Sequence, residues 1–273
     1  MEKIAEAKLF GGYHQVWRHH SDVLGVAMEF ALFVPMGKGP FKPLYFLSGL
    51  TCTWENAATK AGAQKYAADH QMVLIFPDTS PRGDDVADDP SYALGKGAGF
   101  YMSATKSPWA DHYKMDRYIT EELRGLVADM VPLSGDKAGI TGHSMGGHGA
   151  LTLAMKNPDL FGSLSAFAPI VAPSQVPWGR VIFKAYLGED DASWLAYDAC
   201  ALLENKGWDG DILIDVGTAD PFLTEQLTPH LFEASADKAA VDLTMRLQEG
   251  YDHSYYFVAS FIEDHIKWHA SRL

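Results

Sequence analysis

Residues 142–149 read GHSMGGHG and contain the pattern Gly-x-Ser-x-Gly, with Ser144 at its centre. A strand-like run, residues 138–141 (AGIT), leads into this stretch, and a helix-like run, residues 149–156 (GALTLAMK), follows it. A sharp turn from strand to helix lifts a serine hydroxyl clear of the sheet edge. Such a turn brings the backbone close to itself, so it needs glycine beside the serine. The pattern predicts that Ser144 is a nucleophile. A serine hydroxyl requires a base to activate it. The alternative is a glycine-rich helix entry without chemistry.

The composition is that of a folded, acidic protein. The chain has 273 residues, of which 47% are hydrophobic and 12% aromatic, enough to fill a substantial core. The formal net charge of −13 disfavours nucleic acid and anionic membranes as partners, because both require a basic face. Residues 1–6 (MEKIAE) lack the pattern of a signal peptide, and no apolar run reaches the length of a membrane span. With only Cys52 and Cys200 as cysteines, we expect a reduced, cytoplasmic protein.

Short apolar runs alternate with helical patterns along the chain. Such runs suit strands that are buried on both faces of a parallel sheet. We expect strands at residues 26–34, 44–47, 72–76, 138–141, 212–216 and 243–247. We expect helices at residues 56–69, 118–131, 149–156 and 256–273, and an ordered irregular segment at 77–109. This alternation predicts a single α/β domain over residues 1–273, with a mostly parallel sheet and helices on both faces.

Two further residues stand where a base and an acid are expected. Asp220 follows the run at 212–216, and His253 follows the run at 243–247. Functional groups of open α/β sheets lie just beyond the carboxyl ends of the strands. The order Ser144, Asp220, His253 is that of the α/β-hydrolases. The sequence therefore predicts a catalytic triad of these three residues, in which Asp220 orients His253 and His253 activates Ser144.

Other residues compete for these roles. Asp220 precedes Pro221 and could instead cap a helix, and His253 could be a surface loop residue. Asp215 is the competing acid, but it lies inside an apolar run. His265 and His269 have a metal-like spacing, but the intervening glutamate of the zinc-protease motif is absent. We therefore expect these two histidines on a partly exposed helix face.

The predicted reaction also needs hydrogen-bond donors for the oxyanion. In this fold one donor is the backbone N–H after the nucleophile, here Met145. The second comes from the loop after an earlier strand, and residues 48–51 (SGLT) make Leu50 the candidate. The start of the following helix adds its positive end.

Several longer motifs identify a family. They are residues 47–53 (LSGLTCT), 77–83 (PDTSPRG), 97–101 (GAGFY), 142–151 (GHSMGGHGAL), 186–188 (YLG) and 247–256 (LQEGYDHSYY). Together they resemble the S-formylglutathione hydrolase family, also called esterase D, nearly end to end. The resemblance implies an α/β-hydrolase fold and the same triad. It also implies a cytoplasmic, homodimeric serine thioesterase of formaldehyde detoxification that hydrolyses S-formylglutathione to glutathione and formate, without metal or cofactor.

The resemblance also bears on the substrate pocket. The family's cysteine in the SGLTCT segment falls on Cys52, so modification of this thiol is expected to block the site. The alternative is that Cys52 is a small packing residue. We expect Cys52 and Trp178 to line a narrow acyl pocket.

Two segments depart from the family pattern. The family's Cys-Pro-Trp-Gly is Val176-Pro177-Trp178-Gly179 here, and its Asp-Phe-Gly is Ala93-Leu94-Gly95. We expect both segments near the pocket, so they bear on glutathione preference. A general short-acyl carboxylesterase is the main alternative function. An acyltransferase and a non-catalytic binding protein are further ones.

Overall fold

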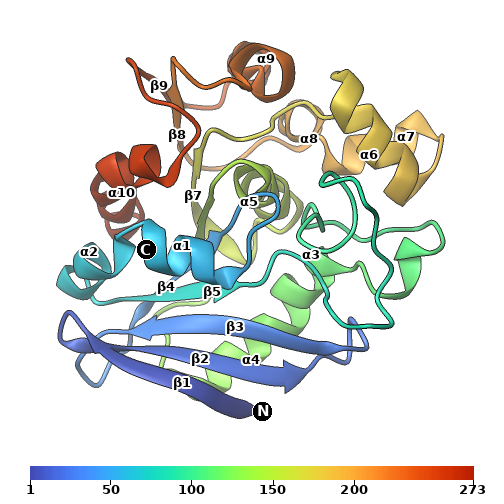
Figure 1. Ribbon diagram of the computed structural model, residues 1–273. Coiled ribbons are helices and arrows are strands. Elements are labelled where there is room, and N and C mark those ends of the chain that lie inside the picture. The colour runs from blue at the N-terminus through green and yellow to red at the C-terminus, as the bar shows by residue number, and fades with distance from the viewer.

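The computed structural model describes residues 1–273 and contains one nine-stranded sheet in the order β1-β2-β3-β5-β4-β6-β7-β8-β9 (Figure 1). The strands are β1 Glu2–Leu9, β2 Gly12–His20, β3 Ala27–Val34, β4 Lys42–Leu47, β5 Met72–Pro77, β6 Ala138–Gly142, β7 Phe161–Phe167, β8 Ile212–Gly217 and β9 Leu243–Gln248. Strands β5, β4, β6, β7, β8 and β9 pair in parallel, whereas β1, β2 and β3 form an antiparallel edge. The prediction of a mostly parallel α/β sheet is confirmed.

Burial follows the strand order. Every residue of β5, β6 and β8 is buried, as expected for strands covered on both faces. The edge strands β1 and β9 are largely exposed or half-buried. A cluster of 72 buried hydrophobic residues fills the space between the sheet and its helices.

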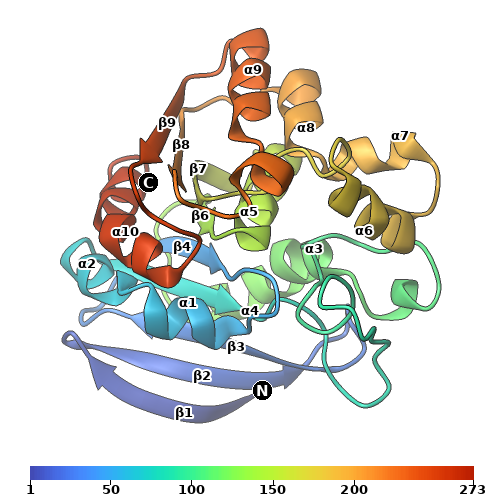
Figure 2. The ribbon, with the colours of Figure 1, turned by 45° about the horizontal axis from the view of Figure 1, so that its top comes forward.

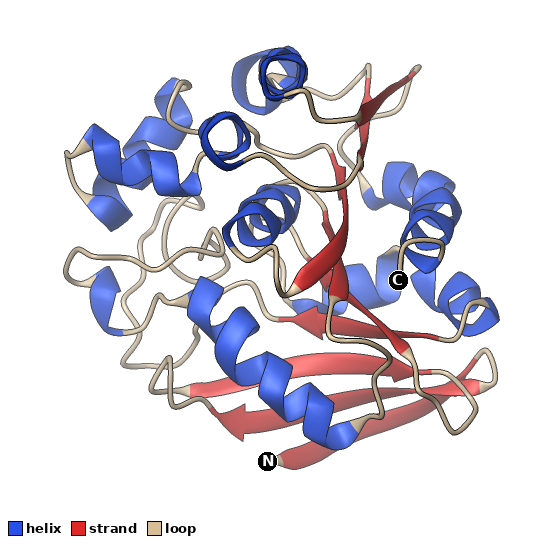
Figure 3. Cartoon of the chain, turned by 180° about the vertical axis from the view of Figure 1, so that it is seen from behind, coloured by secondary structure: helices blue, strands red, loops and turns tan.

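Helices cover both faces of the sheet (Figures 1 and 3). The α-helices are α1 Trp54–Lys60, α2 Ala63–Asp69, α3 Met115–Arg117, α4 Arg124–Met130, α5 Met145–Lys156, α6 Pro177–Leu187, α7 Asp191–Trp194, α8 Ala199–Lys206, α9 Pro229–Ala239 and α10 Tyr255–Ala270. Helices α1, α2 and α10 contact one another and lie on one face, while α5 packs on β6 and β7 from the other. Helices α6 to α9 lie together, away from the N-terminal hairpin (Figure 2). No helix is long and apolar enough to cross a membrane.

The predicted helix at residues 56–69 is wrong in one respect, because the chain forms two helices there. Helix α1 begins at a capping box made by Thr53 and Asn56, and Ala61 caps its C-terminal end. Gly62 then adopts the left-handed conformation, with φ +71°, before α2 starts. Glycine tolerates this conformation without strain, so the chain turns between the two helices.

The prediction that His265 and His269 lie on a partly exposed helix face is also wrong. Both side chains of α10 are completely buried against the sheet. His265 bonds Asp215 of β8 and Ser165 of β7, each at 2.8 Å. His269 bonds Ser163 and Ser165 of β7, at 2.7 and 2.8 Å. The hydroxyl and carboxylate partners make burial of these polar rings possible.

The irregular segment predicted at 77–109 is confirmed. It runs from the end of β5 to the short 3-10 helix at Trp109–Asp111. Its side chains Phe100 and Tyr101 are buried, and the Tyr101 hydroxyl donates to the Ser48 carbonyl over 2.8 Å. This segment therefore packs beside the loop that follows β4.

Candidate active site

Ser144 occupies a strained turn between β6 and α5. Its φ is +58° and its ψ is −117°, a conformation that non-glycine residues seldom adopt. The Ser144 N–H donates to the Phe167 carbonyl over 2.9 Å, which ties the turn to the end of β7. A Cβ at Gly142 would overlap the Gly146 carbonyl, and a Cβ at Gly146 would overlap the Leu47 carbonyl. Glycine is therefore required on both sides of the serine, as the sequence pattern predicted.

The structure brings Ser144, His253 and Asp220 together in a single hydrogen-bonded row. His253 Nε2 lies 2.8 Å from Ser144 Oγ, and His253 Nδ1 lies 2.5 Å from Asp220 Oδ2. The Asp220 side chain is fully buried, while the His253 side chain remains 18% exposed. Asp220 Oδ1 also accepts the Phe222 N–H over 2.8 Å, so the capping role weighed for this residue coexists with its contact to His253. Asp215 is elsewhere, beneath α10.

Two aromatic rings confine the His253 imidazole. The Phe222 ring meets it edge-on at a centroid distance of 4.9 Å. The His143 ring lies 4.6 Å from it on another side. Burial lowers the pKa of His143 well below its usual value, with a smaller contribution from His253. His143 is therefore neutral and adds no competing charge beside the His253 ring.

The residues predicted to supply the oxyanion donors lie close to Ser144. Leu50 and Ser144 both line the cavity, and Met145 directly follows the serine at the start of α5. Neither the Leu50 nor the Met145 N–H donates to a backbone carbonyl in the turns, loops and caps. Gly49 lies so close that a Cβ there would be 3.4 Å from Ser144 Cβ. Both N–H groups are thus free to bind a ligand oxygen beside Ser144.

The cavity above Ser144 has a volume of about 320 Å³, near the lower end for small-molecule sites. The predicted pocket residues Cys52 and Trp178 both line it. Trp178 comes from the start of α6 and packs on Phe100 at a centroid distance of 5.7 Å. Cys52 is half-buried, and burial raises the pKa of its thiol. The Cys52 thiol is therefore held in its neutral form.

Sequence reasoning missed several residues of the cavity wall. They include Asn56, Tyr92, Ile170, Phe222, Gln226 and Leu227. Phe222 follows Asp220 by two residues, and Tyr92 belongs to the irregular segment. Their nearness in sequence to these predicted features could have pointed to both residues. Three residues that differ from the family pattern, Val176, Ala93 and Leu94, do not line the cavity. Their neighbours Trp178 and Tyr92 do line it.

This fold and this arrangement of side chains are those of serine hydrolases of the α/β-hydrolase class. The family model named Esterase matches residues 21–268. An S-formylglutathione hydrolase of Paracoccus denitrificans (strain Pd 1222) is 52% identical over 276 residues, which cover 100% of this chain and 98% of the relative. The chain belongs to the esterase family that contains S-formylglutathione hydrolase.

Solved structures show the same relationship. The structure of an S-formylglutathione hydrolase from Agrobacterium tumefaciens matches with a TM-score of 0.98 and 46% identity, covering 100% of both chains. A fluorophosphonate-binding serine hydrolase of Staphylococcus aureus matches with a TM-score of 0.74 and 20% identity, covering 95% of this chain and 98% of that one. The second likeness concerns the fold alone.

Proposed function

We propose that this protein is a serine thioesterase that hydrolyses S-formylglutathione to glutathione and formate. The observation that carries the proposal is the row Ser144–His253–Asp220, with contacts of 2.8 and 2.5 Å, at the base of the cavity. The names of the full-length relatives from Paracoccus and Agrobacterium supply the substrate. We further propose a cytoplasmic homodimer that acts in formaldehyde detoxification.

The proposed reaction has two steps. His253 takes the proton of Ser144 as Oγ attacks the formyl carbon, and Asp220 stabilises the resulting imidazolium. The N–H groups of Leu50 and Met145 stabilise the oxyanion. The C–S bond then breaks, and His253 gives the proton to the departing glutathione sulfur.

In the second step, His253 takes a proton from water as the water attacks the formyl-serine. The ester bond to Oγ breaks, and His253 returns the proton to Ser144, which releases formate. A formyl group needs little space, and the volume of the cavity suits a small acyl group with part of its leaving group.

A general short-acyl carboxylesterase is the second candidate, and one observation favours it. No lysine or arginine is among the residues that line the cavity, although glutathione carries two carboxylates. The uncharged side chains Asn56, Tyr92 and Gln226 would have to bind the leaving group instead.

The two candidates differ in substrate preference. Purified protein is assayed with S-formylglutathione and with a simple acetate ester, and kcat/KM is compared. The proposal predicts a value at least about a hundred-fold higher for the thioester, since each 1.4 kcal/mol of leaving-group binding in the transition state gives about a factor of ten. Equal values would establish the general carboxylesterase.

A further inference from the structure

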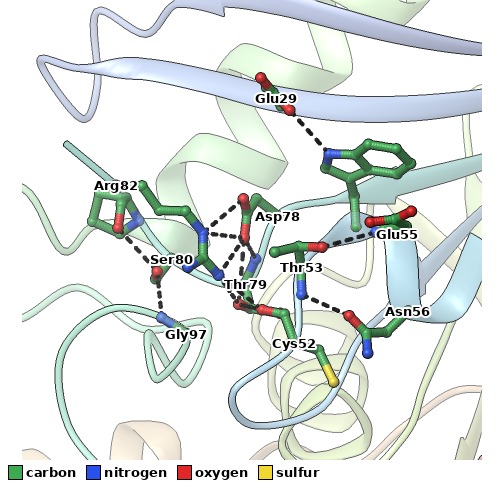
Figure 4. A network of polar contacts seen from close by, with 12 residues as sticks. Glu29, Cys52, Thr53, Glu55, Asn56, Asp78, Thr79, Ser80, Arg82 and Gly97 are labelled. Carbon is green, nitrogen blue, oxygen red and sulfur yellow. Dashed lines mark hydrogen bonds and ion pairs between the residues drawn. The ribbon is translucent and has the colours of Figure 1, made fainter. Parts of the chain in front are cut away.

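The loop after β4, residues 48–53, carries the Leu50 N–H and is anchored by residues that do not line the cavity above Ser144. We call it the oxyanion loop. Two donors converge on its Cys52 carbonyl oxygen (Figure 4). Arg82 Nη2 donates over 2.9 Å, and the Thr79 hydroxyl donates over 2.5 Å. Both donors come from the segment after β5, so a neighbouring strand end fixes the loop.

Arg82 is itself fixed by a buried carboxylate. Its Nε donates to Asp78 Oδ2 over 3.0 Å and its Nη2 to Asp78 Oδ1 over 3.1 Å. Asp78 also accepts the Thr79 N–H over 2.6 Å. Burial raises the pKa of Asp78, and the charge of Arg82 opposes that rise. Paired donors of this kind restrain direction as well as distance, and Figure 4 shows Arg82 between Asp78 and the Cys52 carbonyl.

The remaining contacts make the oxyanion loop a short, closed turn. The Cys52 N–H donates back to the Gly49 carbonyl over 3.3 Å, and the Thr51 N–H donates to the Gly97 carbonyl over 2.9 Å. The Gly97 N–H in turn donates to Ser80 Oγ over 2.7 Å. The Gly49 carbonyl and the Leu50 N–H belong to the same peptide group, so a displacement of Cys52 reaches the Leu50 N–H through the bond between the Cys52 N–H and the Gly49 carbonyl.

We propose that Arg82 and Thr79, held by Asp78, are positioning residues that aim the Leu50 N–H at the oxyanion. The proposal rests on the hydrolytic function proposed above. Oxyanion donors act because they are oriented before the charge develops, and a displaced donor loses most of this advantage. The expected defect therefore concerns the transition state and not substrate binding, which lowers kcat while KM stays nearly constant.

The test compares four variants with S-formylglutathione and an acetate ester. Arg82→Gln should lower kcat by about 10- to 100-fold with both substrates, because loss of a whole oxyanion donor costs about 10²- to 10³-fold. KM should change by less than about three-fold. Thr79→Val should lower kcat by about 3- to 10-fold, and Thr79→Ser, which keeps the hydroxyl, should restore it. Arg82→Lys should stay impaired, since lysine cannot bond Asp78 and Cys52 in the same fork.

Two control variants separate positioning from stability. Arg18 lines the same outer cleft as Arg82 but pairs with Glu29, at 2.6 Å, and not with the oxyanion loop. Arg18→Gln should keep wild-type kcat. Arg246, like Arg82, pairs with a buried aspartate, at 2.5 Å to Asp215. Arg246→Gln should lower the melting temperature while the folded protein keeps its kcat.

The outcomes are distinguishable. A folded Arg82→Gln variant with kcat within two-fold of wild type overturns the inference, as does a loss seen only in KM. If Arg82→Gln does not fold, the Thr79 pair decides, and equal losses in Thr79→Val and Thr79→Ser overturn it. If the wild-type protein hydrolyses neither substrate, the proposed function fails instead.

Discussion

At the scale of single residues, the site depends on atoms that are fixed before substrate arrives. The backbone of Ser144 is held in a strained conformation, with φ +58°. The two ring nitrogens of His253 have different hydrogen-bond partners: Nε2 contacts Ser144, and Nδ1 contacts Asp220. Because the carboxylate of Asp220 accepts a hydrogen bond from Nδ1–H, the proton stays on Nδ1 and Nε2 is free to act as the base.

The first prediction concerns this division of roles. Asp220→Asn keeps the size of the side chain but removes the charge that holds the His253 tautomer. We expect kcat to fall by about 10³- to 10⁴-fold, by analogy with the same change in other serine hydrolases. The melting temperature should stay within a few degrees of wild type. Steady-state kinetics and thermal denaturation check both parts, and near-normal turnover would show that another group orients His253.

At the scale of elements, a buried polar cluster joins α10 to β7, β8 and β9. Asp215 on β8 accepts from Arg246, Gln248 and His265. Burial acts to raise the pKa of Asp215, but the hydrogen bonds from His265, Arg246 and Gln248 together outweigh it and lower the pKa to about 2. None of these bonds involves Ser144, Asp220 or His253, so the cluster contributes to the stability of the fold and not to the geometry of the triad.

The second prediction tests that cluster. Asp215→Asn leaves the guanidinium of Arg246 without its buried anion and weakens the bond to His265. Breaking a buried pair on one side costs about 3–5 kcal/mol, and we expect the lower part of this range because Arg246 remains 31% exposed. Urea denaturation measures the change. A loss below about 1 kcal/mol would mean that packing, not this cluster, holds α10 on the sheet.

At the scale of the whole molecule, strand ends could be predicted from the sequence, while loops and edges could not. Ser144, Asp220 and His253 were found because each follows a short apolar run. Strand β7 was not predicted, since Ser163 and Ser165 interrupt its apolar pattern. Both hydroxyls are buried with hydrogen-bond partners, among them His269. The exposed first strand lacks a pattern for a similar reason, as only the antiparallel pairing with β2 defines it.

The site follows the same rule. The sequence predicts the residues that lie beside motifs. These are the oxyanion candidate Leu50 and the pocket residues Cys52 and Trp178. Tyr92 and Gln226 come from segments without periodicity, and only the fold brings them to the cavity. The positions of His265 and His269 were mistaken because their partners lie 50 to 106 residues away in the chain.

The third prediction concerns the stability of the whole fold at low pH. Burial lowers the pKa of His148 to about 4 and lowers that of His265 and His269 as well. Because the unfolded chain has a histidine pKa near 6.5, it binds more protons than the native state below that pH. The stabilising contribution is complete above about pH 6.5 and is lost as pH falls through the native pKa.

For His148 alone, the loss between pH 6.5 and 4 amounts to about 3 kcal/mol. We therefore expect the melting temperature to fall steadily from pH 7 to pH 5. In a His148→Leu variant the slope should be shallower, whatever its stability at pH 7. A melting temperature that is constant or rises toward pH 5 would contradict the account.

In the proposed reaction, Ser144 carries the acyl group during turnover. The most direct test is to quench the wild-type protein with acid during hydrolysis of a slow acyl ester and to locate the acyl group by peptide mass spectrometry. We expect an acyl ester on Ser144, with neither the ester nor turnover in the Ser144→Ala variant. An acyl group on another residue, or wild-type turnover by Ser144→Ala, would contradict it.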